Sequence, residues 1–328
     1  MSGGLRSRLA ERLQAIWYRD ELPPLVLRLL SRVYQKATKS KLDRPKLKPP
    51  CPLIVVGNLT VGGSGKTPVV AALARHVQSM DLNVAIISRG YGGAEPAEPL
   101  RVDQSTTMQQ SGDEARMLVQ QTGLPLWVCR HRAKALEAAL GQGAEVVISD
   151  DGLQHMQLPR SFELCLIDQA RAFGNGWLLP AGPLRQPLDR LESVDAKLIK
   201  QAVDLAPPEN AASFRLEPVG VRALNASASE LNVSEVDAVA GIADPASFFA
   251  LLEQRDLTLR RHVFGDHQAI DSTWLSRLPG PVVMTAKDAA RLQMPTSRDD
   301  LYVLDVEAQL PAELLEQITE HVRKFAHE

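Results

Sequence analysis

Residues 57–68 combine glycines, a lysine and a threonine in an order that suits phosphate binding. They read Gly-Asn-Leu-Thr-Val-Gly-Gly-Ser-Gly-Lys-Thr-Pro and follow a short apolar run, residues 53–56. Glycine lets backbone N–H groups approach phosphate oxygens without a Cβ in the way. A helix beginning at Lys66 would add the positive end of its dipole. We therefore expect Lys66 to reach the β- and γ-phosphates of a nucleoside triphosphate and the Thr67 hydroxyl to hold Mg²⁺.

This loop departs from the general pattern at one position. A glycine is usual six residues before the lysine, and this chain has Thr60 there. We expect the doubled glycine, Gly62-Gly63, to compensate. The alternative is a glycine turn that binds nothing, but the order of strand, loop and helix favours a nucleotide site. The expected nucleotide-binding residues are Asn58, Thr60, Val61, Gly62, Gly63, Ser64, Gly65, Lys66, Thr67 and Pro68.

A pair of acids follows the apolar run 145–149. Asp150 and Asp151 end this run, and a carboxylate so placed beside a phosphate loop binds Mg²⁺ directly or through water. Two adjacent acids also require a cation, because like charges at short range repel. A plain Asp-Asp-Gly turn is the alternative.

Further polar residues follow other predicted strands, at the edge where doubly wound sheets bind ligands. Arg89 could clamp a phosphate and Tyr91 could stack or hydrogen-bond, although a glycine-rich turn would look the same. Asp113 and Glu114 open a predicted helix, where acids often only complement the helix dipole. His267 follows a later strand, and a lone histidine is more often structural. Residues 178–185 form a rigid apolar loop that could line an apolar substrate or cap a lobe.

Strand and helix patterns alternate from residue 51 onward, which predicts an α/β fold with a parallel sheet covered on both faces. The expected strands are 53–57, 84–88, 126–129, 145–149, 163–167, 197–200, 236–241, 257–263, 281–284 and 301–304. The expected helices are 66–79, 113–122, 131–141, 245–254, 271–277, 287–292 and 310–325. Two short strands around Pro218 and Gly220 are expected to form a β-ribbon. The predicted organisation is an N-terminal segment and linker (1–50), a P-loop domain (51–212), the ribbon (213–224) and a smaller α/β lobe (225–328).

The charge of this 328-residue chain is uneven. Its net charge is −2, yet residues 1–50 hold twelve Lys and Arg against four Asp and Glu, a net of +8, which leaves −10 for the remainder. A basic arm on an acidic body indicates an anionic partner surface. Three widely spaced cysteines favour reduced thiols in or near the core over a disulfide framework or zinc site.

The N-terminal 35 residues have an amphipathic pattern interrupted by Pro23-Pro24. Leucines recur near helical spacing, arginines lie between them, and Trp17 and Tyr18 are typical of a membrane interface. A helix packed on the protein's own core is the open alternative. Residues from Lys39 to Pro50 are expected to be a linker. No signal peptide is evident, and no run reaches the roughly 20 apolar residues that span a bilayer.

Together, the motifs resemble the tetraacyldisaccharide 4′-kinase family of lipid A biosynthesis. The matched segments, in family order, are 57–68, 88–92, 112–114, 150–155, 179–185, 241–243 with Pro245 and Phe248, Phe264 with Asp266 and His267, and 285–289. The family also has Thr at the position of Thr60. The resemblance implies two α/β lobes joined by a β-ribbon with an N-terminal membrane anchor. It also implies an ATP- and Mg²⁺-dependent kinase, peripheral or monotopic at the cytoplasmic face of the bacterial inner membrane.

The resemblance also implies residue roles. Asp113 is expected to be the base for the 4′-hydroxyl of the tetraacylated disaccharide 1-phosphate, with His267 as its partner and Lys66 on the phosphates. Thr67, Glu114, Asp150 and Asp151 are the expected Mg²⁺ environment. Arg89, Tyr91, Gln154, His155 and Arg185 are expected on the substrate side. Gln186 stands where the family is expected to have Glu, which puts an acidic role there in doubt.

Two alternatives remain. A nucleotide-switch GTPase for assembly or metal delivery would normally carry Asn-Lys-x-Asp, and no Asn-Lys pair occurs in this chain. A kinase for a soluble small molecule would leave the basic, Trp-bearing N-terminus without a role. We expect a monomer whose partners are a lipid substrate and an anionic membrane surface, with no nucleic acid.

Overall fold

The structure, a computed structural model, describes residues 12–325 apart from residues 20, 43–46, 104, 226–230, 266–269 and 293–297. The strands are β1 (Leu53–Asn58), β2 (Val84–Ser88), β3 (Leu100–Val102), β4 (Leu126–Val128), β5 (Val146–Ser149), β6 (Phe162–Asp168), β7 (Ala196–Lys200), β8 (Ser213–Ala223), β9 (Glu235–Ala240), β10 (Thr258–Val263), β11 (Val282–Thr285) and β12 (Leu301–Gln309). The helices are α2 (Leu25–Leu42), α3 (Lys66–Gln78), α4 (Met108–Ser111), α5 (Asp113–Thr122), α6 (Arg132–Gly141), the 3₁₀ helix η1 (Leu188–Glu192), α7 (Pro245–Glu253), α8 (Ser272–Leu275), α9 (Ala286–Arg291) and α10 (Ala312–Phe325).

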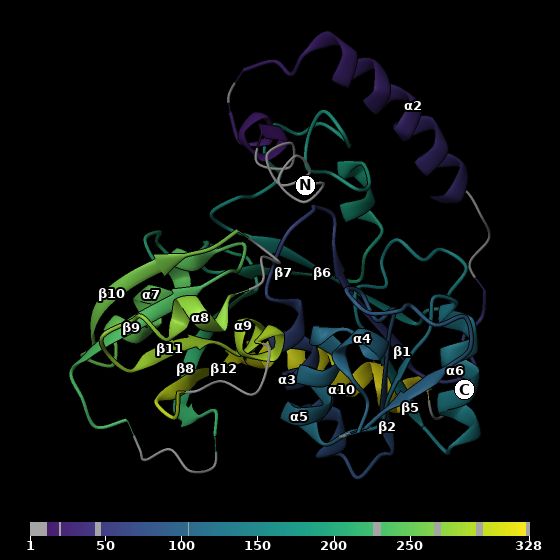
Figure 1. The fold of residues 1–328 in the computed structure, drawn as a ribbon. Helices are drawn as coiled ribbons and strands as arrows, with labels where there is room; N and C mark the ends of the chain where they lie inside the picture. Colours follow the sequence, from purple (N-terminus) through teal and green to yellow (C-terminus); the bar gives the residue numbers. More distant parts are fainter. Residues whose placement is uncertain are drawn as a thin grey trace.

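The predicted α/β class is confirmed. The described strands form one twelve-stranded sheet in the order β10-β9-β11-β12-β8-β7-β6-β1-β5-β2-β4-β3. Neighbouring strands pair in parallel, except β3 with β4 and β12 with β8, which are antiparallel. Figure 1 shows two lobes side by side, one around β1, β2 and β5 and one around β9, β10 and β11, with α9 where they meet.

Strand β1 is buried on both faces, which explains its continuous apolar run. Ile54 and Val56 belong to the core cluster that contains the apolar residues of α3 and α10. Leu53 and Val55 belong to a second cluster, which contains residues of α6 and of the loop around Leu178. The strand is therefore fixed from both sides, and the loop that follows it starts from a rigid base.

The second lobe buries its sheet in the same way. Phe248 and Phe249 of α7 pack with Val236 and Ala238 of β9. Val239, the residue after Ala238, belongs to the cluster on the other face. The alternation along β9 is that of a strand covered on both sides.

Residues 213–223 form one strand, where the sequence predicted two short strands. The register of β8 against β12 shifts between Asp305 and Val306, so that Pro218 faces Val306 and Gly220 faces Asp305. Val219 is the extra residue of this bulge, and a bulge lets a strand pass a proline that has no N–H to donate. Because β8 also pairs with β7, it joins the strands of the two lobes.

Helix α10 ends the described chain but packs on the first lobe. Leu314, Ile318 and Val322 join the cluster that contains α3, and His76 of α3 hydrogen-bonds to the Leu315 carbonyl at 3.1 Å. The boundaries 51–212, 213–224 and 225–328 remain our proposal for the domains, with α10 as the segment that crosses back.

The structure contradicts one prediction for the N-terminal segment, the position of Trp17 at a membrane interface. Residues 12–17 are helical, and Trp17 at their end is only 7% exposed. Its indole N–H donates to the Pro180 carbonyl at 3.0 Å, so Trp17 packs on the protein, whereas Tyr18 is 40% exposed. Helix α2 continues to Leu42, beyond the predicted start of the linker at Lys39, since no proline interrupts it there.

Helix α2 carries an exposed apolar surface. It lies along the outer edge of the molecule (Figure 1) and is fixed by Ser31, whose hydroxyl donates to the Leu178 carbonyl at 2.8 Å. The exposed apolar residues in and just before α2 are Leu22, Leu25, Val26, Leu29, Leu30 and Val33. No helix in the described part of the chain is both long enough and apolar enough to cross a bilayer.

Three short elements were not predicted: β3, α4 and η1. Each has five residues or fewer, too few for a periodic pattern to emerge. The three cysteines, Cys51, Cys129 and Cys165, are buried and form no disulfide, as expected.

Candidate active site

The phosphate loop lies between the end of β1 and the start of α3, as predicted. Gly65, the last loop residue, has a φ of 76°, which few residues other than glycine adopt. The Lys66 ammonium lies 3.2 Å from the Asn58 Oδ1 and 3.7 Å from the Asp151 Oδ1. The lysine is thereby held over the loop by one residue from β1 and one from the turn after β5.

Asp151 forms a bidentate ion pair with Arg185. Both of its carboxylate oxygens lie 3.0 Å from the Arg185 guanidinium. Burial would raise the pKa of Asp151, but the charges of Lys66 and Arg185 lower it below its ordinary value. Asp151 is therefore ionised at neutral pH and joins the phosphate loop to the loop that ends in Arg185.

Asp150 lies in a contrasting setting. It is 1% exposed, and its Oδ1 has no hydrogen-bond partner among the described residues. Burial, followed by the charges of Glu114 and Asp151, raises the pKa of Asp150 to about 7. A buried carboxylate oxygen without a partner, near two other acids, is the environment that a divalent cation would stabilise.

The residues therefore fit Mg²⁺ as a partner of the nucleotide rather than as a free-standing metal centre. Among the described residues, no group of three or more His, Cys, Asp and Glu side chains is arranged to hold a metal ion by itself. Mg²⁺ bound through one or two carboxylates takes its other ligands from phosphates and water. Thr67 lies in the first turn of α3, and Asp150 directly follows β5, which pairs with β1.

Asp113 and Glu114 begin α5 and face the second lobe. Asp113 is 7% exposed, and its Oδ2 accepts from the Arg291 Nε at 2.9 Å and the Nη2 at 2.8 Å. The Lys287 ammonium lies 3.3 Å from the Glu114 Oε1. Both cations come from α9. His267, the expected partner of Asp113, lies outside the described residues.

A glycine explains how Asp113 reaches the site. Gly112 precedes it with a φ of 83°, and a Cβ there would overlap the Tyr91 carbonyl. The loop that contains Arg89 and Tyr91 therefore packs directly on the start of α5. Arg89 is half exposed and forms an ion pair with Glu95 at 3.0 Å, and Tyr91 is 59% exposed. Both side chains are exposed at the rim of the site.

The turn after Asp151 carries Gln154 and His155. The Gln154 amide donates to the Asn58 carbonyl at 2.8 Å, which ties the turn to β1. Burial and the charge of Arg132 lower the pKa of His155 to about 4, so its imidazole is neutral at pH 7. A pocket of about 310 Å³ is lined by residues 130–133 and 154–158.

The loop 178–185 connects this site to the N-terminal segment. The Val61 N–H donates to the Pro183 carbonyl at 2.8 Å, and the Arg185 N–H donates to the Leu59 carbonyl at 2.6 Å. On the other side, the Tyr34 hydroxyl of α2 donates to the Arg185 carbonyl at 3.1 Å. This loop therefore links the phosphate loop to α2 through hydrogen bonds on both sides.

Comparison with known proteins decides the family. A family model described as tetraacyldisaccharide-1-P 4′-kinase matches residues 24–323. A tetraacyldisaccharide 4′-kinase of Pseudomonas paraeruginosa is 40% identical over 309 residues, which cover 90% of this chain and 92% of that protein. The corresponding protein of Pseudomonas fluorescens is 41% identical over 317 residues, with 92% and 93% covered. The chain belongs to the tetraacyldisaccharide-1-P 4′-kinase family.

A solved structure agrees with this assignment. The crystal structure of the "apo" form of LpxK from Aquifex aeolicus, in complex with ATP, superposes with a TM-score of 0.71 and 26% identity, covering 90% of this chain and 97% of that chain. Members of this family phosphorylate the 4′ position of the tetraacyldisaccharide 1-phosphate in lipid A biosynthesis. The resemblance found in the sequence, and the function it implied at this level, are confirmed.

Three basic residues of this kinase were missed by the sequence analysis as site residues. Arg132, at the start of α6, is 4% exposed and donates to the Asp150 carbonyl at 2.9 Å. Burial lowers the pKa of Arg132 to about 10, against the charges of Asp150 and Asp151. Its position after β4, at the ligand-binding edge of the sheet, was an available signal. Lys287 and Arg291 are four residues apart on one helix, which places them on one face.

Gln186 lies beneath the site. It is 2% exposed, and its amide nitrogen lies 3.4 Å from the Leu153 carbonyl. An uncharged side chain here donates to the backbone of the turn that carries Gln154 and His155. An acidic role at this position is therefore absent from this chain.

Proposed function

We propose that the junction of the two lobes is where this kinase transfers the γ-phosphate of ATP to the 4′-hydroxyl of a tetraacylated disaccharide 1-phosphate. The observation that supports this most strongly is the turn 241–243 of the second lobe. Ala243 packs beside Gly63 of the phosphate loop, and the Gly241 carbonyl accepts from Arg291, which also holds Asp113. The second lobe thus touches both the nucleotide loop and the expected base.

The ATP half of the site is assigned to the phosphate loop and its neighbours. Backbone N–H groups of residues 62–65 and the N-terminus of α3 would bind the phosphates, with Lys66 at the β- and γ-positions. ATP in the relative from Aquifex aeolicus supports this assignment. Mg²⁺ would be held by Thr67 and Asp150, with Asp151 and Glu114 nearby, and would neutralise the charge that develops on the phosphates.

The proton of the 4′-hydroxyl is assigned to Asp113. A carboxylate accepts this proton when it lies within hydrogen-bond reach of the hydroxyl. The pairing with Arg291 fixes the Asp113 side chain at the lobe junction, and we retain His267 as its second partner. The substrate-side residues are Arg89, Tyr91, Gln154, His155 and Arg185.

The lipid is proposed to arrive from an anionic membrane surface. Leu25 and Leu29 of α2 are 61% and 51% exposed, and Arg28, Arg32 and Lys36 share the helix. An apolar surface with basic neighbours is the composition of a helix lying in the headgroup region. We therefore propose a monomeric peripheral protein at the cytoplasmic face of the inner membrane.

A phosphoryl-transfer assay tests the reaction. The purified protein, with Mg²⁺ and ATP, is expected to phosphorylate the tetraacyldisaccharide 1-phosphate in micelles and to use GTP poorly. The deacylated disaccharide should be a much weaker acceptor, because it lacks the acyl chains. Equal turnover of the deacylated compound would identify a kinase for a soluble sugar instead.

A vesicle experiment tests the membrane surface. The double variant Leu25→Glu/Leu29→Glu is expected to partition less onto phosphatidylglycerol vesicles, since it places two acids on the apolar surface. The matched control is Leu205→Glu, which alters a residue that is 52% exposed and lies outside the N-terminal segment. Equal partitioning of the double variant and the control would refute the assignment.

A further inference from the structure

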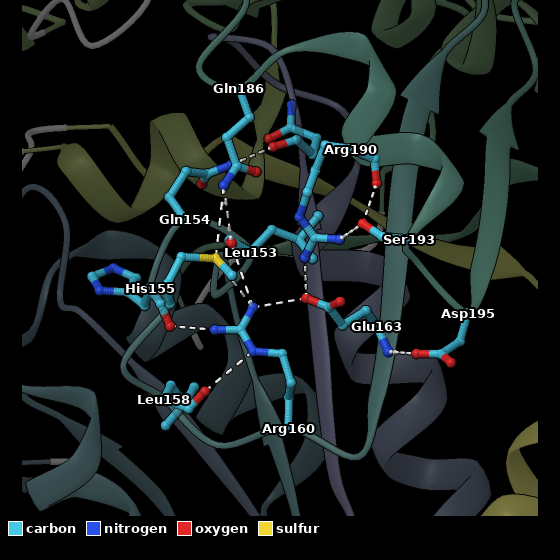
Figure 2. A network of polar contacts seen from close by, with 12 residues as sticks. Leu153, Gln154, His155, Leu158, Arg160, Glu163, Gln186, Arg190, Ser193 and Asp195 are labelled. Carbon is cyan, nitrogen blue, oxygen red and sulfur yellow. Dashed lines mark hydrogen bonds and ion pairs between the residues drawn. The ribbon is translucent and has the colours of Figure 1, made fainter. Parts of the chain in front are cut away.

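Beneath the substrate side of the site lies a buried network of three charged residues (Figure 2). The Arg160 Nη1 donates to the Glu163 Oε1 at 2.7 Å, and Arg190 donates to the same oxygen. All three side chains are at most 4% exposed. Although burial would raise the pKa of Glu163, the two arginines lower it below its ordinary value. The carboxylate is therefore ionised beneath the site.

The remaining donors of Arg160 all point to one turn. Its Nε donates to the Leu158 carbonyl at 3.1 Å, its Nη1 lies 3.5 Å from the Leu153 carbonyl, and its Nη2 donates to the His155 carbonyl. Residues 153–158 belong to no helix or strand. Within the turn the Leu158 N–H donates to the His155 carbonyl at 2.9 Å, and Arg160 adds side-chain donors for carbonyls that no regular ladder satisfies. One planar guanidinium supplies donors to three of them at once.

This turn is part of the site. Gln154 and His155 project from it, and residues 154–158 line the 310 Å³ pocket together with residues 130–133. In Figure 2 the His155 ring points away from Arg160, while its carbonyl points toward the guanidinium. Arg160 therefore holds the wall of the pocket from behind and leaves the side chains of the turn directed elsewhere.

We propose that Arg160, oriented by Glu163 and Arg190, is a positioning residue that fixes the turn bearing Gln154 and His155 for the lipid substrate. A buried ion pair is weak evidence for a stabilising role, because apolar residues of similar volume often do as well. A positioning role explains why the residue is arginine, since its rigid, planar guanidinium can donate to several carbonyls at once. The inference rests on the proposed substrate-side role of Gln154 and His155.

The test variant is Arg160→Lys, which keeps the charge but has a single ammonium for the four acceptors. We expect the KM for the tetraacyldisaccharide 1-phosphate to rise about tenfold, because small misplacements of binding groups are costly. The KM for ATP should stay within about twofold, because the phosphate loop does not contact Arg160 in the described structure.

The chain offers a matched control in the second lobe. Arg298 donates to the Leu275, Leu278 and Gly280 carbonyls at 2.6–2.7 Å and pairs with Asp300 at 2.6 Å. Arg298→Lys therefore removes the same chemistry far from the turn. It should lower the melting temperature and leave the KM for the lipid unchanged.

Three outcomes decide the proposal. A rise of the lipid KM in Arg160→Lys but not in Arg298→Lys supports it, whereas a loss of thermal stability alone in both overturns it. If Arg160→Lys does not fold, Arg190→Lys is the second variant, because it weakens the orientation of Glu163 and retains the charges. A wild-type KM for the lipid in Arg190→Lys would also overturn the proposal. Gln154→Ala tests the substrate-side role of the turn separately. An unchanged KM for the lipid in that variant would mean that the turn does not face the substrate.

Discussion

At the scale of single residues, the carboxylates of the site differ in the groups that surround them. Asp113 is paired with Arg291 and also accepts from the Glu114 N–H at 3.0 Å, which fixes its orientation. Asp150 is buried and its Oδ1 has no hydrogen-bond partner among the described residues; burial, followed by the charges of Glu114 and Asp151, raises its pKa to about 7. The two settings suit the roles proposed for these residues, a base for the acceptor hydroxyl and a ligand for Mg²⁺.

Asp113→Ala should abolish transfer while ATP still binds. The proposed base is lost, and removing general-base catalysis typically costs about 10²–10⁴-fold in rate. The phosphate loop keeps its contacts, so the Kd for ATP is expected to change less than about twofold. Stopped-flow binding of a fluorescent ATP analogue and the transfer assay measure the two effects separately. Near-wild-type kcat in this variant would remove Asp113 from the mechanism.

A buried carboxylate in the second lobe allows a prediction about pH. Asp237 is fully buried and accepts from Arg260 at 3.0 Å, from the Gly280 N–H at 2.9 Å, and lies 2.8 Å from His262. Burial would raise its pKa, but these bonds lower it in the folded protein. Its contribution to stability is therefore fully present above its ordinary pKa near 4 and is lost as the pH falls through the lower folded value.

Asp237→Asn should lower the free energy of unfolding at pH 7 by about 2 kcal/mol, the usual range for a hydrogen bond to a charged group. The difference from the wild type should shrink as the pH falls below about 4. Thermal unfolding across this pH series measures both effects. A difference that does not shrink below about pH 4 would contradict the assigned ionisation.

At the scale of elements, helix α9 brings the second lobe to the two acids at the start of α5. Lys287 and Arg291 lie on one face of α9 and pair with Glu114 and Asp113 at the start of α5. The helix is anchored at its own start by Thr285, whose hydroxyl accepts from the Asp288 N–H at 3.1 Å. A short helix with a fixed start can hold its last residue in place.

Arg291→Met should lower kcat at least tenfold, because Asp113 would lose the group that orients it. The KM for ATP should change little. Arg222→Met is the control, since Arg222 forms a half-exposed ion pair with Asp305 at 2.8 Å on the β8–β12 ribbon, and such pairs contribute little. If both variants have the kcat of the wild type, α9 does not position the base.

The sequence predicted the elements that form from local patterns and missed those decided by distant partners. The strand before the phosphate loop and the helix after it were correct within one residue, because a buried apolar run and helical periodicity are local signals. Arg291 and Asp113 are 178 residues apart, and no periodicity links them. Trp17 was placed at a membrane interface because its partner, the Pro180 carbonyl, cannot be read from sequence.

At the scale of the whole molecule, ion pairs join the two lobes beside the phosphate loop. The Lys200 ammonium of β7 lies 2.8 Å from Asp244 in the second lobe and 3.6 Å from Asp168 in the first. Arg171 donates to the Ala243 carbonyl across the same junction. The continuous sheet connects the lobes on one side, and these contacts fix their angle on the other. Closing the lobes excludes water from a phosphoryl-transfer site, which limits hydrolysis of ATP.

Asp244→Asn should loosen this junction without unfolding the protein. Lys200 keeps Asp168 as its partner, and asparagine still caps α7, where the Asp244 side chain accepts from the Ser247 N–H at 3.3 Å. We expect a larger radius of gyration in X-ray scattering, a several-fold lower kcat and more ATP hydrolysed per lipid phosphorylated. Asp271→Asn is the control, because Asp271 caps α8 in the same way at 2.8 Å within the second lobe. If the two variants behave alike, the effect belongs to the helix cap, and the Lys200–Asp244 pair has no part in holding the lobes together.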